Sequence, residues 1–114
     1  MQRDEAYLLD ILIEARKAIR FVEGLTWEQF EQSELHQNAV IRPLEIIGEA
    51  ARLVSAKTRD DHPEIPWDQM TGMRNRLIHE YSNVNYETVW DTIKNDLPTL
   101  IALIEPLVPP EDKN

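Results

Sequence analysis

The sequence predicts an all-α fold, an antiparallel helical bundle of about five helices. Long segments place hydrophobic residues at alternating spacings of three and four, which is the repeat of one face of an α-helix. No stretch of useful length alternates apolar and polar residues as a strand does, and the chain contains only 3 glycines. Helices that each bury one apolar stripe pack against one another, so this pattern favours a bundle.

The first helix is expected from about Asp4 to Glu23. Its acidic first turn and basic last turns suit the helix dipole. Gly24 follows as the expected stop. Thr26 and Gln29 then have the spacing of a capping box, which predicts a short second helix. The apolar face of the first helix consists of Leu8, Leu12, Ala15, Ile19 and Val22.

A third helix is expected from about Glu34 to Ser55. Pro43 falls inside it, and because proline removes a backbone donor we expect a bend or a broken start near Ile41 and Arg42. Gly48 and the two alanines that follow it should let another helix approach closely. The apolar stripe of this helix consists of Val40, Leu44, Ile47, Ala51 and Val54.

The segment from Thr58 to Pro66 contains two further prolines and a cluster of charges, so it is predicted to be a loop. Pro66 can then open another helix at its first position. The stretch from Trp67 to Tyr81 is either one helix or a short turn that bends at Gly72, and we favour the bend.

Residues 82–85 have turn chemistry, and a last helix is expected from about Tyr86 to Leu107, with a kink at Pro98. Its stripe consists of Val89, Ile93, Leu97, Leu100 and Ile104. A chain of 114 residues is expected to form one domain, here residues 1–108, followed by a polar tail over residues 109–114.

Composition limits the possible functions. The net charge of -9, from 12 basic and 21 acidic residues, argues against a protein that coats nucleic acid, so any RNA chemistry must use a local basic site. The chain has no cysteine, which excludes disulfides, cysteine zinc sites and thiol nucleophiles. Without an apolar leader or a membrane-spanning run, we expect a cytoplasmic protein that does not contact a membrane.

The densest group of arginine and histidine side chains lies at Arg74, Arg76 and His79. Asn75 is one helical turn before His79, so its amide can orient the imidazole of a general base. Arg74 lies about 140° from His79 around an ideal helix, so one helix does not place both groups on one phosphate, whereas two copies in a symmetric dimer can. An imidazole and a guanidinium without metal ligands suit metal-independent RNA cleavage. The alternative is structural: His79 caps a helix end and Arg74 pairs with an acidic residue.

Other candidate sites are weaker. Glu45 and Glu49 are one turn apart and are expected to form a solvated face, where one of them can pair with Arg74 and position it. His36 and His62 are expected to be solvated, and no set of residues has the spacing of a metal site. The chain has no glycine-rich phosphate loop, so we expect it to bind no ATP or other cofactor by itself.

The segment RNRLIHEY, residues 74–81, resembles the R-x4-6-H motif of HEPN domains in its HepT form. Two further blocks fall in the order and spacing of that family: RPLEIIGEAA at 42–51 and VWDTIKNDLPTLI at 89–101. The sequence PWDQMTGM, which precedes the motif, agrees as well. The chain therefore resembles the HepT-like toxins of the HEPN superfamily, also called the DUF86 family, over nearly its whole length.

This resemblance implies a HEPN-like bundle that forms a homodimer and acts as the toxin of a type VII-like HEPN/MNT toxin–antitoxin system. Such toxins cleave cellular RNA, tRNA or mRNA, without a metal ion. Carried over by position, Arg74 and His79 would be the catalytic pair at the dimer cleft, with Asn75 and Arg76 in support. The antitoxin, a minimal nucleotidyltransferase (MNT), would neutralise the toxin by AMPylation of Tyr81. The alternative is a non-catalytic helical subunit that serves as the target of a nucleotidyltransferase complex.

Overall fold

The protein is described here by a computed structural model that covers residues 3–110. Within that range all regular secondary structure is helical, which confirms the predicted all-α class. The elements are α1 (Arg3–Phe21), α2 (Trp27–Glu31), α3 (Glu34–Leu53), α4 (Ala56–Asp61), α5 (Trp67–His79), η1 (Tyr81–Asn83), α6 (Tyr86–Asp91), η2 (Thr92–Asp96), α7 (Leu97–Ile104) and η3 (Glu105–Leu107). The last four residues of the predicted polar tail lie outside the described range.

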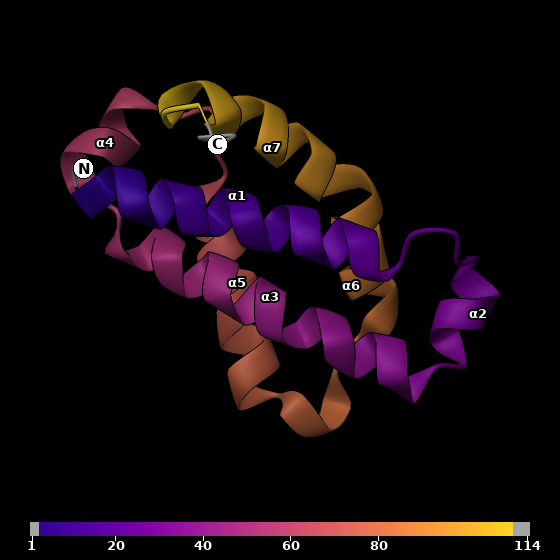
Figure 1. The fold of residues 1–114 in the computed structure, drawn as a ribbon. Coiled ribbons are helices and arrows are strands. Elements are labelled where there is room, and N and C mark those ends of the chain that lie inside the picture. The colour runs from indigo at the N-terminus through magenta and orange to yellow at the C-terminus, as the bar shows by residue number, and fades with distance from the viewer. Residues whose placement is uncertain (1–2, 111–114) are drawn as a thin grey trace.

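The long helices α1 and α3 run antiparallel through the centre of the molecule (Figure 1). Helix α5 packs on α3, and α7 packs on α1, so these two outer helices sit on different parts of the central pair. The core between them is entirely apolar, since no polar or charged side chain among the described residues is buried. Burial of the apolar stripes, not a polar network, therefore holds the bundle together.

Two helix ends follow the local sequence as predicted. Gly24, after α1, adopts the left-handed conformation with φ of 82°, in which a side chain is strained. Thr26 and Gln29 form the predicted capping box, with each side chain bonded to the other residue's backbone N–H.

The broken start that was one of the two expectations for α3 near Ile41 and Arg42 is wrong. The helix continues from Glu34 to Leu53 through Pro43, which is itself buried in the core. Helices α1 and α5 both pack along α3, and this tertiary packing offsets the local cost of the proline.

The favoured bend at Gly72 is also wrong, because α5 is one helix from Trp67 to His79. Glycine inside a helix costs about 1 kcal/mol relative to alanine. Burial of a large apolar side chain, such as Met73 or Leu77, contributes about 1.5–3 kcal/mol, and several of them line the inner face of α5. Burial therefore outweighs the propensity of one glycine. Pro66 is the N-cap of α5, whereas it was expected at the first helical position.

The last predicted helix is divided by a change of helix type. Residues Thr92–Asp96 form a π-helical turn, in which the N–H of Leu97 donates to the carbonyl of Thr92. This turn ends two residues before Pro98, which has no N–H to continue the α-helical ladder. The wider turn thus precedes the proline, and the chain then continues as α7.

The predicted loop from Thr58 to Pro66 is wrong in its first half, where α4 forms. Asp4 of α1 anchors this helix from a distant part of the chain. One of its carboxylate oxygens accepts from the N–H of Ser55 at 3.0 Å, and the other accepts from the hydroxyls of Ser55 and Thr58, both at 2.6 Å. The bond from the Ser55 hydroxyl, then that from the Thr58 hydroxyl and last that from the Ser55 N–H lower the pKa of Asp4 below its ordinary value of 3.8.

We expect the substitution Asp4→Asn to lower the free energy of unfolding at neutral pH by about 1 kcal/mol, because bonds to a charged acceptor are lost. The folded-state pKa is depressed, so this contribution is present above the unfolded value and is lost as pH falls through the folded value. Urea denaturation of both proteins at several pH values measures the difference, which should shrink toward zero in acid. Glu5→Gln, in the same first turn of α1, is the control. An equal loss in both variants would contradict the anchor.

Candidate active site

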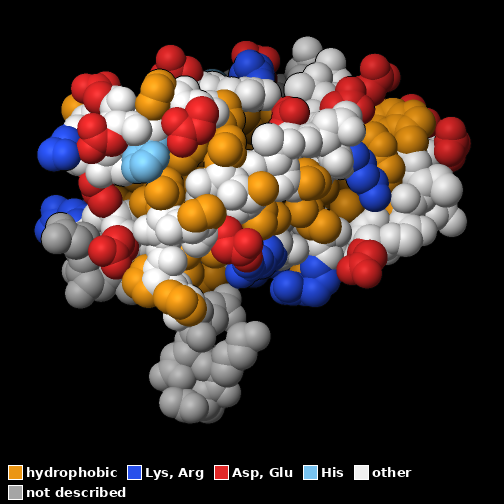
Figure 2. Space-filling view, turned by 90° about the horizontal axis from the view of Figure 1, so that it is seen from above, with side chains coloured by type: hydrophobic (Ala, Val, Ile, Leu, Met, Phe, Trp, Pro, Cys, Tyr) orange, Lys and Arg blue, Asp and Glu red, His pale blue; other side chains and the backbone are white. Residues whose placement is uncertain are grey.

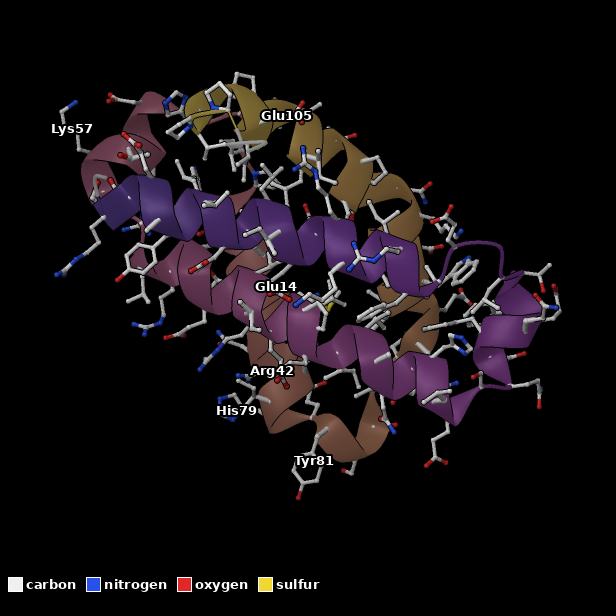
Figure 3. All side chains as sticks on the ribbon, viewed as in Figure 1. Glu14, Arg42, Lys57, His79, Tyr81 and Glu105 are labelled. Carbon is white, nitrogen blue, oxygen red and sulfur yellow. The ribbon has the colours of Figure 1, made fainter. Side chains whose placement is uncertain are left out.

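The predicted site residues Arg74, Asn75, Arg76 and His79 all lie on α5, and Tyr81 follows in η1. Figure 3 shows His79 and Tyr81 at the end of α5 that projects away from the centre of the bundle. Four buried side chains hold α5 in place, namely Trp67, Met70, Met73 and Leu77. Asn75, Arg76 and His79 are thus exposed on a firmly packed helix, while Arg74 is half-buried beside α3.

Gly48 of α3 sets the distance between α3 and α5 at the position of Arg74. A Cβ atom added to Gly48 would lie 2.2 Å from the Cβ of Arg74 and 2.7 Å from the carbonyl oxygen of Met70. Real Cβ atoms do not approach other atoms so closely, so only glycine fits here. The predicted close approach of another helix at Gly48 is confirmed, and it occurs at the arginine of the motif.

The guanidinium of Arg74 is held on two sides. Its Nη2 lies 3.6 Å from Oε1 of Glu49, and its Nη1 donates to Oδ1 of Asn75 at 3.0 Å. The expected ion pair between the third helix and Arg74 is therefore present, with Glu49 as the partner. An arginine has five N–H donors, so most of them stay available to a ligand.

Glu49 also binds Arg52, whose Nε and Nη2 donate to its two carboxylate oxygens at 3.2 and 2.8 Å. The hydrogen bonds from Arg52, together with the positive charges of Arg52 and Arg74, lower the pKa of Glu49. Glu49 is therefore a carboxylate at neutral pH, and it stands between two guanidinium groups.

Asn75 and His79 do not interact as the helical spacing suggested. The amide oxygen of Asn75 is bound to Arg74, and the exposed ring of His79 has no hydrogen bond or ion pair with any residue from 3 to 110. His79 is the last residue of α5, and its side chain is exposed. Asn75 therefore supports the arginine of the pair and leaves the imidazole open to solvent.

Arg74 and Ile78 line a groove of about 240 Å³ between α1, α3 and α5, and His79 is not part of its lining. Of the two groups, which an ideal helix separates by about 140°, only Arg74 therefore lies at this groove.

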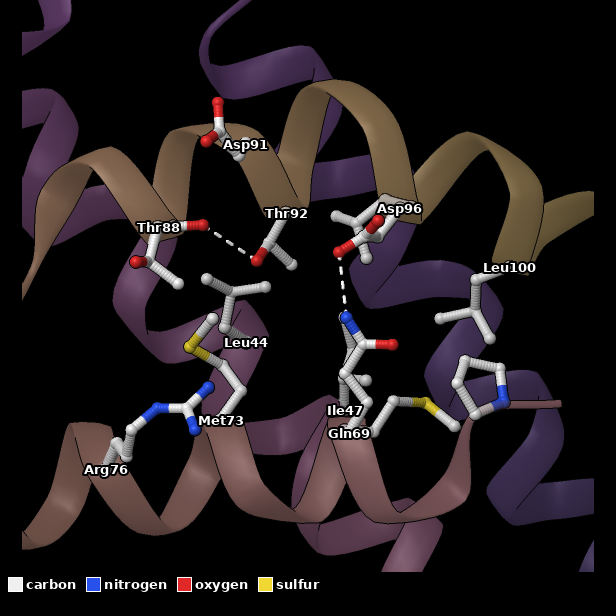
Figure 4. Close-up of a pocket in the computed structure, with 13 residues that line it drawn as sticks. Leu44, Ile47, Gln69, Met73, Arg76, Thr88, Asp91, Thr92, Asp96 and Leu100 are labelled. Carbon is white, nitrogen blue, oxygen red and sulfur yellow. Dashed lines mark hydrogen bonds between the residues drawn. The ribbon is translucent and has the colours of Figure 1, made fainter.

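Arg76 lies in a second groove, on the opposite side of α5 from Arg74. This cavity of about 180 Å³ lies between α5 and the α6–α7 segment, over an apolar floor that includes Leu44 and Ile47 (Figure 4). Gln69 donates across its mouth to Asp96 at 3.0 Å. The sequence motif gave no sign of this cavity, because it arises from the different packing of α5 and α7 on the central helices.

Figure 2 views the molecule from the side opposite the projecting end of α5, and on that face acidic and basic side chains are interspersed and form no broad basic patch. Tyr81 is 78% exposed, so its hydroxyl is open to another molecule. Among residues 3–110 there is no group of three or more histidine and carboxylate side chains placed to hold a metal ion. Nor does any helix in that range have the length and apolar character needed to cross a membrane.

Comparisons with known proteins place the chain in a family. The profile of the ribonuclease HepT-like family matches residues 11–107. The "Probable ribonuclease HepT" of Thermococcus cleftensis is 40% identical over 108 residues, which cover 94% of this chain and 98% of that protein. A protein of Caldanaerobacter subterraneus subsp. tengcongensis, named "Putative RNase", is 37% identical over 111 residues, which cover 97% and 99% of the two chains.

A protein of Methanocaldococcus jannaschii with the same name is 39% identical over 101 residues, which cover 89% of this chain and 93% of that one. No solved structure gives a significant match. The family profile and these relatives cover nearly the whole chain, including α3, α5 and the motif between Arg74 and Tyr81. The chain belongs to the ribonuclease HepT-like family.

Proposed function

We propose that this chain is a ribonuclease that cleaves cellular RNA, tRNA or mRNA, and acts as the toxin of a type VII-like HEPN/MNT toxin–antitoxin system. The observation that carries the proposal is the pair on α5: an open imidazole at His79 and a tethered guanidinium at Arg74 with free donors. The names of the relatives support the same reaction.

In the proposed reaction, His79 accepts the proton of a ribose 2′-hydroxyl as its oxygen attacks the adjacent phosphorus. The bond from phosphorus to the 5′-oxygen breaks, and that oxygen takes up a proton from solvent. Arg74 binds the phosphate oxygens and stabilises the charge that develops on them. These groups supply both the base and the positive charge, so the reaction is proposed to need no metal ion.

The proposed active unit is a homodimer, in which Arg74 of one copy and His79 of the other face the same phosphate. The groove beside Arg74 supports this arrangement, because Leu53 and Ile78, 40% and 36% exposed, present apolar surface at its rim. Apolar surface of this kind is typically covered in a complex. A two-fold axis at this groove produces two equivalent composite sites.

Tyr81 is the proposed site of control. It lies two residues after His79 and is 78% exposed, so an MNT-type nucleotidyltransferase can reach its hydroxyl. Transfer of AMP from ATP to that oxygen, with release of pyrophosphate, would place a negative phosphate beside the site and repel RNA. Mass spectrometry after incubation with such a transferase and ATP should find AMP on the wild type and none on Tyr81→Phe.

The direct test is incubation of the purified protein, free of partner, with total cellular RNA in the presence and absence of EDTA. We expect fragments in both, and intact RNA with His79→Ala. Equal amounts of intact RNA with wild type and His79→Ala would contradict the ribonuclease. In that case the alternative, a non-catalytic target subunit, would account for the exposure of Tyr81.

A further inference from the structure

We infer that Glu49 is a positioning residue for RNA cleavage, which holds the guanidinium of Arg74 in the orientation that receives the phosphate. The inference rests on the proposed function. Glu49 lies on α3, outside the motif of α5, and is brought to Arg74 by the close approach of the two helices at Gly48.

The contacts define what Glu49 can do. Its Oε1 lies 3.6 Å from Nη2 of Arg74, while Asn75 accepts from Nη1 of the same guanidinium. The ion pair on one terminal nitrogen and the hydrogen bond on the other favour one orientation of the guanidinium and leave most of its N–H donors free. A long side chain that is already oriented loses less rotational freedom when it binds a phosphate.

Arg52 keeps Glu49 in place for this task. Its two hydrogen bonds orient the carboxylate and favour its charged form, so the carboxylate is present over the neutral range. Arg52 is itself exposed on the same helix and does not line the groove beside Arg74. Arg52 thus binds Glu49, and Glu49 in turn forms the ion pair with Arg74.

The pair contributes little to the fold. The side chains of Arg74 and Glu49 are 27% and 40% exposed in the single chain, and exposed ion pairs stabilise proteins by only about 0–1 kcal/mol. Loss of Glu49 should therefore leave the bundle folded, and a loss of activity would report on the position of Arg74. Glu45, one turn earlier, lines the same groove but has no ion pair with any residue from 3 to 110, so it is a matched control.

The first test compares cleavage of a short fluorescent RNA by wild type, Glu49→Gln and Glu45→Gln. We expect Glu49→Gln to lower kcat about tenfold with a smaller change in KM, because a misplaced donor loses more in the transition state than in the ground state. Glu45→Gln removes a charge from the same groove without an ion pair to Arg74, so it should lower kcat less than Glu49→Gln does. Equal activity of Glu49→Gln and Glu45→Gln would overturn the inference.

The second test needs no activity, so it separates this inference from the proposed function. In ¹⁵N spectra of the arginine side chains, the Arg74 guanidinium should be restrained in wild type and in Glu45→Gln. It should become mobile in Glu49→Gln. A guanidinium equally mobile in all three proteins would overturn the inference even if RNA is cleaved. If wild type cleaves no RNA but the restraint is present, the proposed function fails and Glu49 retains only a structural contact.

Discussion

Alanine at His79 is expected to reduce the rate of RNA cleavage by about 10²–10⁴-fold, the usual contribution of a general base. The imidazole is exposed and bonded to no residue from 3 to 110, so its removal should leave the thermal stability unchanged. If His79 instead had a structural role at the end of α5, the alanine variant would be less stable and would still cleave RNA.

Single-turnover cleavage of a defined RNA, measured beside a thermal unfolding curve for each variant, separates these cases. His62→Ala is a suitable control because His62 lies in the segment before α5. The backbone carbonyl of His62 accepts from the indole N–H of Trp67, and the substitution keeps this carbonyl. Cleavage by His79→Ala at the rate of His62→Ala would remove His79 from the reaction.

The substitution Gly48→Ala is expected to cause the second large effect. The new methyl group would meet the Cβ of Arg74 and a backbone carbonyl of α5, neither of which can move without shifting the helix. Overpacking of this kind typically costs about 1–3 kcal/mol. Since α5 must move away from α3, Arg74 should also leave Glu49, and cleavage should fall together with stability.

Gly72→Ala is the matched control, because it makes the same change inside the neighbouring helix. There the added Cβ would meet, among residues 3–110 and apart from the backbone of its own helix, only the Nη1 of Arg76, at 3.9 Å. Alanine is the better helix former by about 1 kcal/mol, so this variant should be more stable than wild type. Urea denaturation of both variants tests the contrast, and a similar change in both would contradict the close contact at Gly48.

The sequence predicted the helical class and the glycine contact because both depend on local pattern and residue size. It did not predict α4, whose anchor is the carboxylate of Asp4, 51 residues before Ser55. It overestimated the effects of Pro43 and Gly72, because propensity alone does not include the burial that long helices gain in the bundle.

Within the candidate site, helical spacing assigned Asn75 the wrong partner. A polar side chain on a helix can reach several neighbouring side chains. Only the packed structure shows that the Asn75 amide binds the Arg74 guanidinium. The position of Arg76 in a separate groove likewise depends on how α6 and α7 pack, which no motif encodes.

The central claim is that each site combines Arg74 from one copy with His79 from the other. It is tested most directly by a heterodimer of Arg74→Ala and His79→Ala, purified through a different tag on each chain. One of its two composite sites would be intact, so about half of the wild-type activity is expected although each homodimeric variant is inactive. A heterodimer as inactive as its parents would contradict the claim.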